Sequence, residues 1–147
     1  MTFKLSHFNI VTLIPEMFDG LEHGLVGKAF KDGKVSKELI NPRDFTTDKH
    51  KTVDDRPYGG GPGMVMMLEP LIKAIEYSNN KNKLLKKKKV IHLTPRGKLL
   101  NHKKVMELLN FEELTILSSR YEGVDERINN WIDEEIPVGD YVTSGGE

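Results

Sequence analysis

The chain has 147 residues, with 22 lysines and arginines against 22 aspartates and glutamates, and it has no cysteine. Its length suits one domain with a single core, its zero net charge provides no overall basic field for nucleic acid, and the lack of cysteine excludes disulfides and thiolate chemistry. No segment resembles a signal peptide or reaches a membrane-spanning length, so a cytoplasmic protein without a membrane partner is expected.

The first half of the chain predicts two strands, two helices and a long loop. Apolar and β-branched residues at 8–14 predict a strand, and Pro15 with Glu16 suits the first turn of a helix that follows it. Residues 24–31 are compatible with a second short helix, and residues 35–40 with a second strand. No period is sustained over the roughly 23 residues from 41 to 63, which points to a functional or mobile loop.

The second half alternates predicted helices and strands. Helices are predicted at 69–77, 101–109 and 125–132, and short apolar strands at 90–93 and 114–117. This alternation indicates the α/β class, with a parallel sheet covered by helices on both faces. Six lysines lie between Lys81 and Lys89; they are interpreted as a solvated approach to the next strand, with phosphate contact as the alternative.

The segment 54–64 reads Asp-Asp-Arg-Pro-Tyr-Gly-Gly-Gly-Pro-Gly-Met, which suits a ligand-binding loop better than a helix or strand. It is no P-loop, because Met64–Met67 stands where the Gly-Lys-Ser/Thr should follow. The chain also lacks a Gly-x-Gly-x-x-Gly fingerprint, a His-x-x-x-His pair and a Gly-x-Ser-x-Gly elbow. No nucleotide hydrolysis, metal site or serine hydrolase is therefore predicted.

Three further loops follow predicted strands, at residues 94–97, 118–123 and 136–146. Ligands of open α/β sheets bind outside the carboxyl ends of the strands, so these loops would converge on one pocket. Structural interpretations stay open for each: ordinary proline and glycine turns, a helix cap at Asp125 and a frayed tail at 144–146.

The chain resembles the bacterial tRNA (guanine-N1)-methyltransferase (TrmD) family over essentially its whole length. The motifs that carry this resemblance are Leu13 to Phe18, Pro42-Arg43-Asp44-Phe45-Thr46, the glycine loop, Thr94-Pro95-Arg96-Gly97, Arg120-Tyr121-Glu122-Gly123 and Gly139 to Glu147. The resemblance implies a SPOUT-type trefoil-knot fold, a homodimer with the active site between subunits, and S-adenosyl-L-methionine as methyl donor. It implies transfer of the methyl group to N1 of the guanine just 3′ of a tRNA anticodon.

The resemblance also implies roles for particular residues. The donor-binding residues would be Thr94, Pro95, Gly97, Ser119, Tyr121, Glu122, Gly123, Val138, Gly139, Tyr141, Thr143, Gly145 and Gly146. Glu122 and Arg120 would be catalytic. Glu122 would read the guanine edge, because a carboxylate can accept hydrogen bonds from N–H donors. Asp44, Asp54, Asp55 and Arg56 would belong to a loop on the RNA side.

The chain departs from the family pattern at Ser119, where a glycine is usual, and at His92, where a tyrosine is common. The family's aspartate general base and its tRNA-gripping second domain are expected beyond Glu147, so residues 1–147 are interpreted as the N-terminal catalytic domain. Two alternatives remain: a non-catalytic binding or dimerisation module, and a knotted methyltransferase that modifies another RNA nucleotide.

Overall fold

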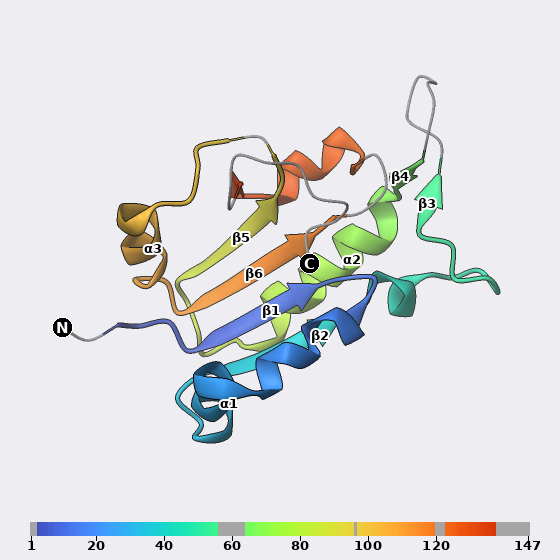
Figure 1. The fold of residues 1–147 in the computed structure, drawn as a ribbon. Coiled ribbons are helices and arrows are strands. Elements are labelled where there is room, and N and C mark those ends of the chain that lie inside the picture. Colours follow the sequence, from blue (N-terminus) through green and yellow to red (C-terminus); the bar gives the residue numbers. More distant parts are fainter. Residues whose placement is uncertain (1–2, 56–63, 96, 120–122, 138–147) are drawn as a thin grey trace.

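A five-stranded sheet in the order β2-β1-β6-β5-β7 forms the centre of the fold (Figure 1). The computed structural model describes residues 3–55, 64–95, 97–119 and 123–137. The strands are β1 (His7–Val11), β2 (Ser36–Ile40), β5 (Lys88–Leu93), β6 (Glu113–Ser118) and β7 (Glu134–Ile136). Every neighbouring pair is parallel, which confirms the predicted parallel sheet.

Helices cover both faces of this sheet, as predicted. On one face, α2 (Leu68–Lys81) and the 3-10 helix η3 (Glu126–Trp131) pack together, and on the other face lies α3 (His102–Leu108). The 3-10 helix η1 (Pro15–Glu22) and α1 (Gly24–Lys31) connect β1 to β2. None of the helices in the described ranges is long and apolar enough to span a membrane.

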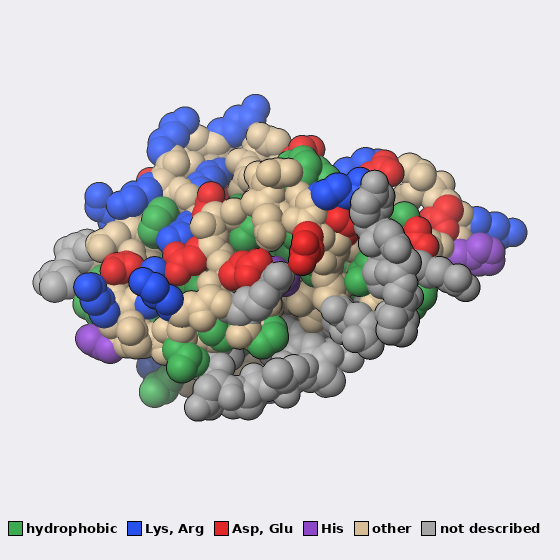
Figure 2. All heavy atoms as spheres, turned by 90° about the horizontal axis from the view of Figure 1, so that it is seen from above, with side chains coloured by type: hydrophobic (Ala, Val, Ile, Leu, Met, Phe, Trp, Pro, Cys, Tyr) green, Lys and Arg blue, Asp and Glu red, His purple; other side chains and the backbone are tan. Residues whose placement is uncertain are grey.

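Charges of both signs are distributed over the surface rather than separated. Figure 2 shows Lys and Arg side chains interspersed with Asp and Glu on the face seen from above. Several charged side chains of the described residues form ion pairs, such as Lys37–Glu22 and Lys81–Glu38, each at 2.5 Å. The lysine tract contributes to this pattern, since Lys88 and Lys89 pair with Glu113 and Glu134.

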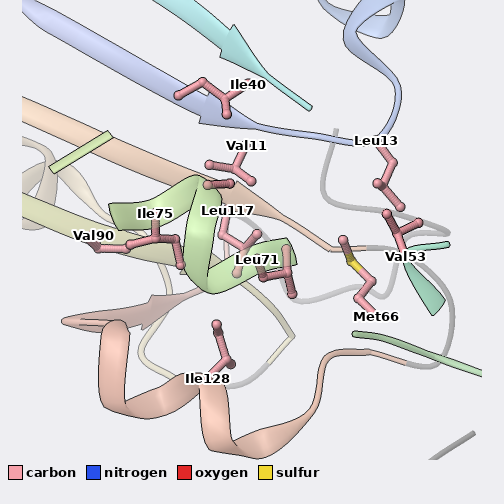
Figure 3. Close-up of a cluster of buried hydrophobic side chains, with 11 residues drawn as sticks. Val11, Leu13, Ile40, Val53, Met66, Leu71, Ile75, Val90, Leu117 and Ile128 are labelled. Carbon is pink, nitrogen blue, oxygen red and sulfur yellow. The ribbon is translucent and has the colours of Figure 1, made fainter. Parts of the chain in front are cut away.

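The larger core cluster joins the sheet to α2 (Figure 3). Val11, Val90 and Leu117 come from three strands and lie against Leu71 and Ile75 of α2; none of the five is more than 4% exposed. The cluster then continues through Leu13 toward Val53 and Met66, beyond the end of the sheet. A smaller cluster on the opposite face contains Ile91, Leu114 and Ile136.

The stretch 41–63 is more regular than its sequence suggested. It contains the 3-10 helix η2 (Pro42–Phe45) and strand β3 (Asp54–Asp55), which pairs antiparallel with β4 (Val65–Met66). The segment predicted to be a functional or mobile loop without a sustained period therefore contains regular structure in these parts. Asn41 caps η2 by accepting a 3.0 Å hydrogen bond from the Arg43 N–H, and β3 depends on a partner that lies outside the local sequence.

Four more element predictions need correction. The predicted helices after Pro15 and at 125–132 are 3-10 helices, and β7 was not predicted at all. The first strand ends at Val11 rather than at residue 14, because the Thr12 hydroxyl accepts a 3.1 Å hydrogen bond from the Ile14 N–H and Pro15 cannot donate to a neighbouring strand.

Hydrogen bonds between the exposed Ser36 and the buried side chains of His7, Asn9 and Thr115 connect three strands near the amino end of the sheet. Ser36 Oγ lies 2.5 Å from His7 Nδ1, and His7 Nε2 lies 2.8 Å from Asn9 Oδ1. Asn9 Nδ2 donates to Thr115 Oγ1 at 3.2 Å. Because an amide oxygen can only accept, His7 Nε2 carries a proton here, and the line of bonds favours one register of β2, β1 and β6.

Candidate functional site

The candidate site lies at the carboxyl edge of the parallel sheet. Because β6, β5 and β7 are adjacent and parallel, the segments that follow them begin side by side, at Ser119, Thr94 and Pro137. This is the edge at which open α/β sheets bind ligands. The expected convergence of the three loops is therefore borne out for their first residues.

The loop after β5 is tied to β7 at both of its ends. The Thr94 N–H donates to the Ile136 carbonyl at 3.4 Å, and the Leu100 N–H donates to the Pro137 carbonyl at 2.9 Å. Between them, Gly97 has φ +98°, and a Cβ placed there would lie 2.4 Å from the Glu135 carbonyl oxygen. Only glycine fits this approach, and both Pro95 and Gly97 are exposed.

Ion pairs hold β7 in turn on the rest of the structure. Glu134 lies 2.5 Å from the Lys89 ammonium group of β5 and 2.8 Å from that of Lys104 in α3. Burial acts to raise the pKa of Glu134, but hydrogen bonds from Lys104 and Lys89 outweigh it and keep that pKa below its usual value. Ion pairs therefore connect the short edge strand β7 both to β5 and to α3.

The segment after β6 is fixed by the hairpin β3–β4. The Gly123 carbonyl accepts a 3.0 Å hydrogen bond from the Met66 N–H, and Met66 and Val124 form an isolated parallel bridge. Gly123 itself has φ +123°, a conformation that side chains with L chirality rarely adopt. Ser119 is half-buried at the start of this segment.

Asp125 caps η3, which is the structural role considered for it. Its Oδ1 accepts from the Arg127 N–H at 3.0 Å, and its carboxylate pairs with the Arg127 guanidinium through Oδ1 and Oδ2. The side-chain hydrogen bond from Arg127 lowers the pKa of Asp125 against the opposing effect of burial. Asp125 therefore stabilises the start of the element that follows the β6 loop.

The described acidic residues of the RNA-side loop lie on two different elements. Asp54 and Asp55 form β3, whereas Asp44 is exposed in η2, which packs against α2. Asp55 also lines a hollow of about 460 Å³ whose wall includes Leu68, Ile72 and Arg127. The other predicted site residues lie outside the described ranges: Arg56, Arg120, Tyr121, Glu122, Val138, Gly139, Tyr141, Thr143, Gly145 and Gly146.

Sequence reasoning assigned no role to Met66, Glu135 or Pro137, whose backbones fix the loops at this edge. No local signal could have identified them, because each acts on a segment that is distant in the sequence. A second hollow, of about 680 Å³, opens beside Ser6, His7 and Ser36 at the amino ends of β1 and β2, away from the carboxyl edge of the sheet. No group of three potential ligands in the described ranges could hold a metal ion.

Comparisons with known proteins agree with this geometry. A family model described as tRNA (Guanine-1)-methyltransferase TrmD matches residues 6–147. The tRNA (guanine-N(1)-)-methyltransferase of Pseudoalteromonas atlantica is 54% identical over 142 residues, which are 95% of this chain and 53% of that protein. The protein of the same name from Coxiella burnetii is 52% identical over 139 residues, covering 94% of this chain and 56% of that protein.

A solved structure is similar over nearly the whole chain. The crystal structure of tRNA (m1G37) methyltransferase from Aquifex aeolicus has a TM-score of 0.83 and 40% sequence identity, and the match covers 97% of this chain and 63% of that one. The chain thus spans about half the length of the curated relatives it matches.

Proposed function

The chain belongs to the tRNA (guanine-1)-methyltransferase TrmD family, and on that premise we propose that it builds the methyl-donor pocket of an enzyme that methylates N1 of a guanine in tRNA. The observation that carries this proposal is the arrangement at the carboxyl edge, where the loop after β5 is tied to β7 beside the start of the β6 loop. The proposed donor is S-adenosylmethionine, and the proposed nucleotide is the guanine 3′ of the anticodon.

The described residues fit such a donor. Fixing both ends of the loop 94–100 on β7 leaves Pro95 and Gly97 exposed, so the loop can cover a ligand without first having to order itself. Main-chain groups at a sheet edge can hold an adenine through its polar edge. Residues 138–146 and Tyr121 are proposed to complete the pocket on the strength of the family motifs.

The proposed reaction explains why acidic and basic groups are needed around the guanine. The sulfur–methyl bond of the donor breaks, a bond from the methyl carbon to N1 forms, and the proton of N1 passes to a general base. Negative charge that develops on O6 needs a cation or hydrogen-bond donor. We assign Glu122 to the guanine N–H groups and Arg120 to charge stabilisation, with an aspartate outside residues 1–147 as the proposed base.

A methyl-transfer assay tests the proposal directly. The protein that carries this chain is incubated with methyl-labelled donor and tRNA transcripts, and the RNA is digested and analysed for N1-methylguanosine. We expect label in transcripts with guanosine 3′ of the anticodon and none when adenosine replaces it. Label in another nucleotide would support the alternative knotted methyltransferase, and donor binding without label in any tRNA would support the binding-module alternative.

Self-association belongs to the same proposal. The family resemblance implies a homodimer whose active site lies between subunits, and sedimentation equilibrium measures this without the reaction. A dimer mass that persists at assay concentrations is the expected result; an active monomer would contradict it. The trefoil knot and the cytoplasmic location stay predictions.

A further inference from the structure

Met66 occupies the middle position of a small three-stranded arrangement. On one side it lies opposite Asp54 in the β3–β4 hairpin, and on the other it forms the parallel bridge to Val124. Its N–H donates to the Gly123 carbonyl at 3.0 Å, away from β3, while the next N–H, of Met67, donates to the Val53 carbonyl at 2.7 Å. One backbone position thus connects the hairpin to the segment after β6.

The same residue is anchored in the core. Met66 is 0% exposed and belongs to the larger core cluster, in which its side chain lies beside those of Val53 and Leu13 (Figure 3). A hairpin with strands of two residues is not stable by itself, so this burial and the bridge to Val124 hold it in place. Removing the Met66 side chain would loosen the hairpin and the bridge together.

We propose that Met66 is a positioning residue, which holds the β6 loop in its working place by fixing it to the RNA-side hairpin. The inference rests on the proposed function: Gly123 directly follows Glu122, the proposed guanine reader, and Asp54 and Asp55 belong to the proposed RNA side. Met66 touches neither reactant. It acts through the backbone of Gly123 and Val124, which it holds at the end of the segment that follows β6.

A purely structural role for Met66 would give a different result from a positioning role. Truncating any fully buried side chain lowers stability, so stability alone cannot distinguish them. Ile75 offers a matched control, because it is also 0% exposed and in the same core cluster, but lies on α2 away from the bridge. Met66→Leu offers a conservative variant that retains most of the side-chain volume.

The kinetic test compares Met66→Ala, Met66→Leu and Ile75→Ala in the protein that carries this chain, at a temperature well below all unfolding midpoints. Since a displacement of about 1 Å at a reacting centre can cost about 100-fold in rate, we expect kcat for tRNA methylation to fall about tenfold to 100-fold in Met66→Ala. The KM of Met66→Ala for the donor should change little. Both Met66→Leu and Ile75→Ala should have a kcat close to that of the wild type. Equal kcat values for Met66→Ala and Ile75→Ala would overturn the proposal.

Hydrogen exchange tests the coupling without the reaction. Met66→Ala should accelerate amide exchange in residues 119–125 about tenfold more than Ile75→Ala does, whereas equal acceleration would overturn the inference. The two proposals can fail separately. A wild-type protein that methylates no guanine refutes the proposed function, and the exchange rates still decide the role of Met66.

Discussion

At the scale of single residues, Gly97 decides whether the loop after β5 can lie on β7. A side chain there meets the Glu135 carbonyl oxygen at 2.4 Å and is strained at φ +98°. Strain of this kind costs about 1–3 kcal/mol, so Gly97→Ala should displace the loop and weaken donor binding about tenfold or more, measured by isothermal titration.

Gly33 provides the control for this prediction. It also has a positive φ, +73°, but a Cβ there meets nothing within 4 Å and its turn precedes β2 at the opposite edge of the sheet. Gly33→Ala should lower stability and leave donor affinity unchanged. If both variants bind the donor equally well, the loop at Gly97 does not cover the pocket.

Glu122 lies outside the described residues, and its proposed role makes a separate prediction. If its carboxylate accepts from the guanine N–H groups in the transition state, Glu122→Gln should reduce kcat about 100-fold with little change in the Kd of the donor. Glu126→Gln makes the same chemical change at an exposed position in η3 and should retain activity. Equal losses of activity and donor affinity in Glu122→Gln would contradict the assignment.

Asp125 should make stability depend on pH. The hydrogen bond from Arg127 lowers its pKa in the folded protein, so the folded state binds fewer protons than the unfolded chain in the acidic range. The stabilisation is therefore fully present above about pH 4, the ordinary pKa of aspartate, and is lost as the pH falls through the lowered value.

Asp125→Asn isolates this charge effect, because asparagine also caps helices. Urea unfolding should show that the wild type is more stable than Asp125→Asn at pH 6 and that the difference disappears toward pH 2. A stability difference that is constant over this range would mean that the charge contributes nothing.

At the scale of elements, the register of the central strands depends on polar contacts as well as on packing. Asn9→Leu would leave the His7 Nε2–H and the Thr115 hydroxyl without their partner, at a cost of about 1–3 kcal/mol in the free energy of unfolding. Asn130→Leu, at an exposed site in η3, should change it by less than about 0.5 kcal/mol.

The double variant Asn9→Leu with Thr115→Val tests the mechanism. Replacing both partners of a buried hydrogen bond by apolar groups costs less than leaving one of them without a partner. The double variant should therefore lose less free energy of unfolding than the two single variants lose in total. Additive losses would mean that the hydrogen bond between Asn9 and Thr115 has no specific role.

Local sequence patterns predicted some strands of this fold and missed others. Apolar runs located β5 and β6 because strands that are buried on both faces are mostly apolar, although each also contains buried polar residues such as His92 and Thr115. They missed β7, whose sequence Glu134-Glu135-Ile136 has two acidic residues out of three, because its position is fixed by Lys89 and Lys104 from other elements. They missed β3 and β4 because two-residue strands have no period to detect.

At the scale of the whole molecule, one sheet separates two core clusters and should make them unfold together. The single tryptophan, Trp131, packs against the larger cluster, so its fluorescence reports on the α2 face, while far-UV circular dichroism reports on all elements. Because both clusters share β5 and β6, the two signals should give one coincident urea transition. Separate midpoints would show that the faces unfold independently.

The α/β class, the parallel sheet covered on both faces and the family could all be predicted from the amino-acid sequence, because they depend on the alternation of predicted strands and helices and on local motifs such as Thr94-Pro95-Arg96-Gly97. The folded structure alone shows which distant segments meet: Gly97 on the Glu135 carbonyl, and Met66 on Gly123 and Val124. The physical reason is that these contacts are made by backbone groups. Backbone N–H and C=O groups are nearly the same at every residue, so their pairing over long sequence distances leaves no residue pattern to read.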